Sequence, residues 1–80
     1  MAPVMTPTTN GRTAIIIRID PHGIAILEDT DSHETFAITF DRIRGYRGEG
    51  VAELSRRGIS AGKRVRFTAP NDRVDYVDVA

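Results

Sequence analysis

The sequence predicts an all-β domain, a small barrel of five short strands with one short helical segment. Its 80 residues allow one small domain, and a composition that is 40% hydrophobic and 28% charged is typical of a globular chain. Short runs of β-branched or alternating apolar residues are separated by turns rich in Gly, Pro, Asn and Asp at regular spacing. A barrel is favoured over an open sheet because closing the strands removes exposed edges.

The first half of the chain predicts three strands. Residues 13–19 hold four isoleucines within five positions, and this density of β-branched side chains favours a strand over a helix. A turn that contains a proline and a glycine separates it from a second strand at residues 24–27, and residues 28–33 are expected to form a polar, acidic turn. The third strand is expected at residues 34–40, where Phe36, Ile38 and Phe40 alternate with Thr35, Ala37 and Thr39.

The second half predicts a short helix and two more strands. A glycine-rich loop over residues 41–50 leads to residues 51–57, which are long enough for about two helical turns and end at Gly58, a typical C-terminal stop. The fourth strand is expected at residues 63–69 and the fifth at residues 73–79. In the fourth strand Val65 and Phe67 are expected to face inward, and Arg64 and Arg66 outward.

This order of elements is typical of a five-stranded OB-type barrel, in which a short helix lies between the third and fourth strands. An SH3-like barrel has the same number of strands and a similar size, and it is the alternative. We expect residues 12–80 to form the barrel. Residues 1–11, which include two prolines, are expected to be a disordered tail.

The sequence argues against several classes of protein and of functional site. No segment approaches the roughly 18 apolar residues that span a membrane, and the first residues do not resemble a signal peptide, so a cytoplasmic protein is expected. The chain has no cysteine, which excludes disulfides, thiolate metal sites and a cysteine nucleophile. His22 and His33 lack the spacing of metal ligands. No catalytic constellation is found, so neither an enzyme nor a cofactor is expected.

Three segments resemble cold-shock domains in order and spacing, apart from an insertion around residues 47–57. Residues 22–27 (His-Gly-Ile-Ala-Ile-Leu) stand where that family has Lys-Gly-Phe-Gly-Phe-Ile. Residues 36–43 stand at its Val-Phe-Val-His-Phe motif, and residues 58–67 resemble its turn and fourth strand, Leu-x-x-Gly-x-x-Val-x-Phe. The resemblance covers about residues 13–79 and implies an OB barrel that binds single-stranded RNA or DNA.

The residues that stack on bases in that family are mostly replaced here. Ile24, Ile26 and Ala37 stand at three aromatic positions, Thr39 stands at the histidine, and only Phe40 is still aromatic. Stacking contributes about 1–3 kcal/mol per base, so the loss of three aromatic rings predicts weak binding to single strands.

The distribution of charge gives a second reason to expect nucleic-acid binding. The net charge is zero, but residues 1–41 carry two arginines against six carboxylates, and residues 42–66 carry eight basic residues against two carboxylates. One hypothesis is therefore an arginine-driven binder of single-stranded RNA or DNA. Its candidate binding residues are Arg18, His22, Phe40, Arg42, Arg44 and Tyr46. The alternative interpretation of the arginines is a solvated surface that pairs with the acidic half.

The second hypothesis is a protein-interaction module, which binds a protein partner or a second copy of the chain. If the cold-shock register holds, Ile24, Ile26 and Ala37 form an exposed aliphatic face, and contiguous exposed apolar area usually marks an interface. Two alternatives remain for this face. The insertion or the tail could cover it, or a register slip of one residue could turn it inward.

Overall fold

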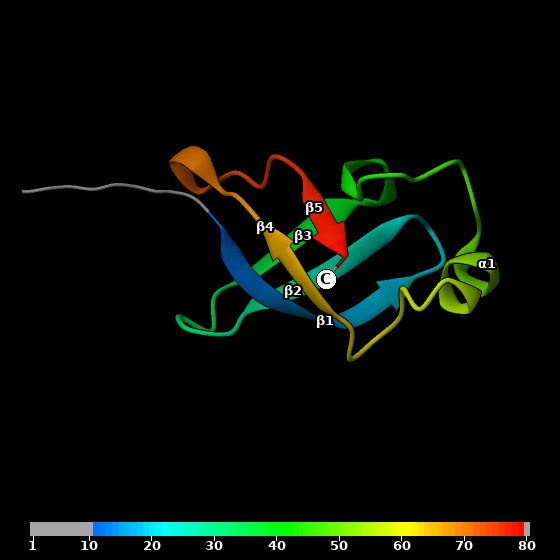
Figure 1. Ribbon diagram of the computed structural model, residues 1–80, viewed down its shortest axis with the longest axis horizontal. Helices are drawn as coiled ribbons and strands as arrows, with labels where there is room; N and C mark the ends of the chain where they lie inside the picture. The colour runs from blue at the N-terminus through cyan, green and yellow to red at the C-terminus, as the bar shows by residue number, and fades with distance from the viewer. Residues whose placement is uncertain (1–10, 80) are drawn as a thin grey trace, which may run out of the picture.

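The computed structural model describes residues 11–79, and in this range the chain folds as a five-stranded all-β barrel of the OB type (Figure 1). Residues 1–10, which carry nearly all of the expected tail, lie outside the described residues. The strands are β1 (Arg12–Asp20), β2 (Ile24–Asp29), β3 (Thr35–Thr39), β4 (Arg64–Phe67) and β5 (Val77–Val79). A helix, α1 (Val51–Arg56), stands between β3 and β4, and two 3-10 turns, η1 (Phe40–Arg42) and η2 (Pro70–Asp72), complete the fold.

The strand order distinguishes the OB barrel from the SH3-like alternative. The sheet runs β3-β2-β1-β4-β5, and its neighbouring strands are antiparallel. The fourth strand returns beside the first, which is the Greek-key order of an OB barrel. The barrel closes through one parallel bridge, between Ile43 and Val77, where the backbone N–H of Arg44 donates to the carbonyl of Val77 at 2.8 Å.

A β-bulge at Ile17 decides which side of β1 each isoleucine takes. Ile16 lies opposite Leu27, but Arg18 lies opposite Ile26, so the register shifts by one residue between them. Ile16 is therefore buried, Ile17 and Arg18 both lie on the outside, and Ile19 turns back to pack against the core. Without the bulge, simple alternation would turn Arg18 inward.

The core fills the barrel and is covered at one end by α1, at the right of Figure 1. Leu54 is the buried residue of this helix and is fully inaccessible. The helix begins at Gly50, whose N–H donates to the carboxylate of Glu53, and the predicted stop at Gly58 is confirmed, with a positive φ of 83°. The other buried apolar residues are Ala14, Ile16, Ala25, Leu27, Ile38, Phe40, Ile43, Ile59, Val65, Phe67 and Val77.

Two expected elements differ from the structure. The predicted fifth strand at residues 73–79 is wrong in its first half, because only Val77–Val79 pairs with β4. The predicted turn at residues 28–33 begins too early, since β2 continues to Asp29, which is buried. The inward positions of Val65 and Phe67 and the outward positions of Arg64 and Arg66 are confirmed.

Candidate protein-interaction surface

The outer side of β1, β2 and β3 carries a contiguous aliphatic face. The cross-strand pairs place Ile26 between Arg18 and Ala37, and Ile24 opposite Thr39. Ile17 is 44% exposed beside this row. We define the aliphatic face as the outward apolar residues of the three strands: Ile15, Ile17, Ile24, Ile26 and Ala37.

Sequence reasoning found three of these five residues and missed Ile15 and Ile17. Both line a shallow hollow of about 310 Å³ on the outside of the barrel, together with Glu28 and His33. The alternation of residues along β1 could have identified both, because before the bulge it places the side chains of odd-numbered residues on the outside of the barrel. The register slip that would have turned Ile24 and Ile26 inward does not occur, because Ala25 and Leu27 are the buried residues of β2.

Charges of both signs surround the aliphatic face. Arg18 lies within it, and Arg64 lies opposite Ile15 on β4. Carboxylates stand at both ends, since Glu28 pairs with Ile15 across the strands and Asp20 pairs with Ile24. These carboxylates would repel a phosphate backbone that crossed the face, whereas a mixed-charge rim around an apolar centre is typical of protein interfaces.

Phe40 is not available for base stacking, which corrects the expectation that it contacts nucleic acid. Its side chain is buried, with 5% of the residue exposed, at the start of η1. The ring packs edge-on against Tyr46, with the centroids 5.8 Å apart. Tyr46 is itself half-buried, and its hydroxyl donates to the carbonyl of Glu49. Both rings therefore anchor the loop after β3 to the core.

The expected arginines of the loop engage groups of the protein itself. The Arg44 Nε lies 2.7 Å from a carboxylate oxygen of Asp78, and its guanidinium stacks 5.0 Å from the ring centroid of Tyr76. Arg42 reaches the carbonyl of Asp75 at 3.4 Å. The side chains of Arg44 and Asp78 are both exposed, so their ion pair is screened by solvent and contributes little to stability.

The two remaining expected residues lie on β1 and on the turn that follows it. His22 is exposed in the β1–β2 turn, where its backbone N–H and its ring both approach the carboxylate of Asp20 at 2.8 Å. These contacts, the backbone one first, hold the pKa of Asp20 below its ordinary value. Arg18 lies within the aliphatic face. Because Phe40 is buried, the six expected nucleic-acid residues do not all lie on one exposed surface.

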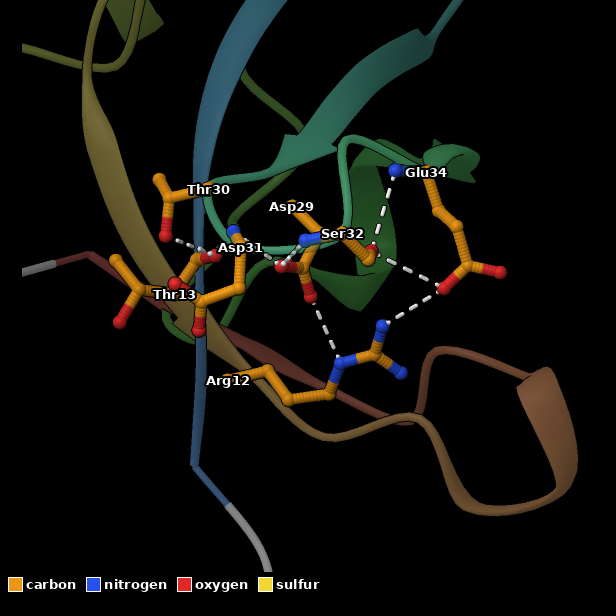
Figure 2. Close-up of polar contacts among 7 residues, drawn as sticks. All are labelled: Arg12, Thr13, Asp29, Thr30, Asp31, Ser32 and Glu34. Atoms are coloured by element: carbon orange, nitrogen blue, oxygen red, sulfur yellow. Dashed lines mark hydrogen bonds and ion pairs between the residues drawn. The ribbon is translucent and has the colours of Figure 1, made fainter.

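A polar cluster that sequence reasoning missed closes the far end of the barrel, next to the β2–β3 turn (Figure 2). Asp29 accepts hydrogen bonds from the backbone N–H groups of Asp31 (2.7 Å) and Ser32 (3.0 Å) and from Arg12 Nε (2.8 Å). The Arg12 guanidinium also lies 5.3 and 5.2 Å from the ring centroids of Phe36 and Phe67. The carboxylate of Asp29 and the guanidinium of Arg12 both have partners within the cluster, so we assign these two groups to stability.

In the described range no group of three or more His, Cys, Asp or Glu side chains could hold a metal ion. Among the same residues no helix is long and apolar enough to cross a membrane. The chain matches no family model, no curated protein and no solved structure.

Proposed function

We propose that this protein is an interaction module that buries its aliphatic face against another protein. The observation that supports this proposal most is the contiguous outward set of four isoleucines and Ala37 across three paired strands. Burial of apolar surface stabilises an interface by about 25 cal/mol per Å², whereas aliphatic side chains offer no flat ring for base stacking.

The aliphatic face is too small to form a whole protein interface by itself. Three strands about 4.8 Å apart and five residues of about 3.3 Å cover roughly 240 Å² in projection. A standard interface buries about 800 Å² on each partner. The aliphatic face is therefore the centre of an interface, and the charged residues around it, Arg64, Glu28 and Asp20, supply its polar rim.

The test replaces one isoleucine of the face and compares it with an exposed valine elsewhere. Ile17→Asp places a charge in the aliphatic face, and Val79→Asp places the same charge on β5, where Val79 is also exposed. We expect both variants to be as stable as the original chain, within about 0.5 kcal/mol, because both positions are exposed. Sedimentation velocity over a concentration series measures self-association, and quantitative affinity purification with the tagged chain measures other partners.

The expected result is an association that Val79→Asp preserves and Ile17→Asp abolishes. If Ile17→Asp, Val79→Asp and the original chain show the same oligomeric state and the same bound proteins, the proposal is wrong.

A second candidate function, binding of single-stranded RNA or DNA, is favoured by three exposed arginines. Arg18, Arg64 and Arg66 point outward from β1 and β4, and no carboxylate of the described residues lies within ion-pair distance of them. Fluorescence anisotropy with labelled single-stranded oligomers tests this function at low and near-physiological salt. Binding that depends on phosphate contacts must weaken steeply as salt rises, and Arg64→Ala with Arg66→Ala must weaken it for all sequences about equally. A flat salt response contradicts this candidate.

A further inference from the structure

The free edge of β3 presents unpaired backbone groups. The N–H of Phe40 donates to the carbonyl of Gly23, and the N–H of Asp29 donates to the carbonyl of Glu34. Because hydrogen-bonded pairs alternate along an antiparallel ladder, Phe36 and Ile38 must point their backbone groups at β2. Thr35, Ala37 and Thr39 point theirs away from β2, where no partner lies within the described part of the chain.

A groove runs along this edge because the barrel does not close there. β5 is only three residues long, and the closing bridge at Ile43 and Val77 lies beyond the end of β3. Every residue of β3 lines the groove, and its opposite wall is formed by Arg42, Arg73 and Val74.

The groove has the size of a short strand. Its volume is about 530 Å³. One residue of a strand occupies roughly 160 Å³, from a rise of about 3.4 Å, a strand spacing of about 4.8 Å and a sheet thickness of about 10 Å. The groove therefore holds roughly three residues of extended chain, which matches the three residues of β3 with free backbone groups.

The side chains that line the groove define what would bind there. Phe36 and Val74, which are both partly exposed, provide apolar contacts, and Arg42 and Arg73 provide two positive charges. Among the described residues that line it there is no carboxylate. In strand addition the backbone hydrogen bonds supply affinity, while alternate side chains of the added strand supply specificity.

We propose that the groove binds an extended acidic peptide, which adds to β3 as a further strand of the sheet. Carboxylates of the peptide would pair with Arg42 and Arg73, and its alternate apolar side chains would contact Val74 and Phe36. A second copy of this chain fits less well, because its own β3 would bring its arginines against those of the first copy. The groove adjoins the aliphatic face at Ala37, but the inference rests on the free backbone edge of β3 and on the two arginines, so it does not depend on the proposed function.

The probe is a labelled six-residue peptide of alternating glutamate and valine, and the matched lysine–valine peptide is the control for charge. Fluorescence anisotropy measures binding to the full chain, and amide hydrogen exchange reports the N–H groups of Thr35, Ala37 and Thr39. We expect the glutamate peptide to bind and to slow exchange at these three positions. We expect the lysine peptide to bind at least about tenfold more weakly, since it loses charge-assisted hydrogen bonds and faces two arginines.

Two variants test the backbone and the charge separately. Ala37→Pro removes an N–H that points to the free edge, so it should keep the ladder with β2 and weaken peptide binding about tenfold or more. Arg73→Glu reverses one charge of the groove and should weaken binding similarly. Arg56→Glu makes the same change on the exposed side of α1 and should leave binding unchanged. If Ala37→Pro does not fold, peptide binding to Arg73→Glu and the hydrogen-exchange data still test whether the peptide binds in the groove.

Three results would overturn the proposal. The glutamate peptide could fail to bind the full chain. Arg73→Glu and Arg56→Glu could weaken binding equally, which would show a non-specific charge effect. Sedimentation without peptide could show a dimer that Ala37→Pro dissociates and Ile17→Asp preserves, and a second copy would then be the occupant of the groove.

Discussion

Asp29 shows how one buried carboxylate can order a turn. It is 3% exposed, and burial on its own would raise its pKa. The backbone N–H groups of Ser32 and Asp31 and the guanidinium of Arg12 outweigh burial, and the pKa of Asp29 is held below its ordinary value of 3.8. Three donors on one carboxylate therefore stabilise the folded state and fix the path of the β2–β3 turn.

We predict that Asp29→Asn lowers the free energy of unfolding by about 1.5–3 kcal/mol. An asparagine oxygen can still accept from the turn, but the charged hydrogen bond to Arg12 is lost, and such bonds contribute about this amount. Asp31→Asn is the matched control, because its exposed side chain should change stability by less than about 0.5 kcal/mol. Urea unfolding of the three chains measures the difference, and equal losses in both variants would contradict the role of Asp29.

The lowered pKa of Asp29 predicts that the stability of the protein depends on pH. Because the pKa of Asp29 is lower in the folded than in the unfolded chain, its contribution is complete above about pH 5. It is lost as the pH falls below the unfolded pKa and through the folded one, where the carboxylate becomes protonated. Asp29→Asn should therefore flatten the acid side of the stability curve, and an unchanged curve would contradict this assignment.

At the scale of elements, α1 is an end cap for the barrel rather than a binding helix. Six residues are too few for a helix to be stable in isolation, so its stability must come from tertiary contacts. Leu54 supplies the buried side chain, and Glu53 and Gly58 define the two ends. The carboxylate of Glu49 and the guanidinium of Arg57 also pair, which ties the loop before the helix to its C-terminal end.

We predict that Leu54→Ala costs about 2–5 kcal/mol, because it leaves a cavity where the helix covers the core. Small domains have about 5–15 kcal/mol in total, so this loss would be a large fraction of the stability. Ser55→Ala, on the exposed side of the same helix, should stay within about 0.5 kcal/mol. Thermal unfolding separates the two variants, and a small effect of Leu54→Ala would mean that the helix is not part of the cooperative core.

At the scale of the whole molecule, the barrel is closed on one side and open on the other. β1 pairs along its length with β2 and along its first part with β4, but β3 and β5 are joined only beyond the end of β3. The short fifth strand is thus the cause of both the groove and the free edge of β3. An exposed edge with unpaired backbone groups favours strand pairing with another chain unless something covers it.

The distribution of charge over the molecule also follows from the fold. Among the described residues, no ion pair joins the basic segment 42–66 to the acidic half 1–41. Arg44 pairs with Asp78 of β5, and Arg57 pairs with Glu49 of the basic segment itself. The interpretation of the arginines as a surface that pairs with the acidic half is therefore not supported by these pairs.

The elements were largely predictable because their signals are local. The isoleucines of β1, the alternation of β3 and β4 and the glycine after α1 each specify a conformation through neighbours in sequence. Part of the candidate site was predictable in the same way, since alternation in β2 places Ile24 and Ile26 on one side. The burial of Phe40 also follows the alternation, since it shares the parity of Phe36 and Ile38. Alternation alone could not predict the extra residue in β1 or the shortened β5.

The sequence by itself thus determined the class of fold, the order of its elements and an outward aliphatic set, all of which depend on local propensity and on the two-residue period of a strand. Only the tertiary structure decided which isoleucines are exposed, because the bulge in β1 is set by its pairing with β2. It also decided that Asp29 is buried with Arg12 and that β3 keeps a free edge. These features arise from contacts between residues far apart in the chain, and no local pattern encodes them.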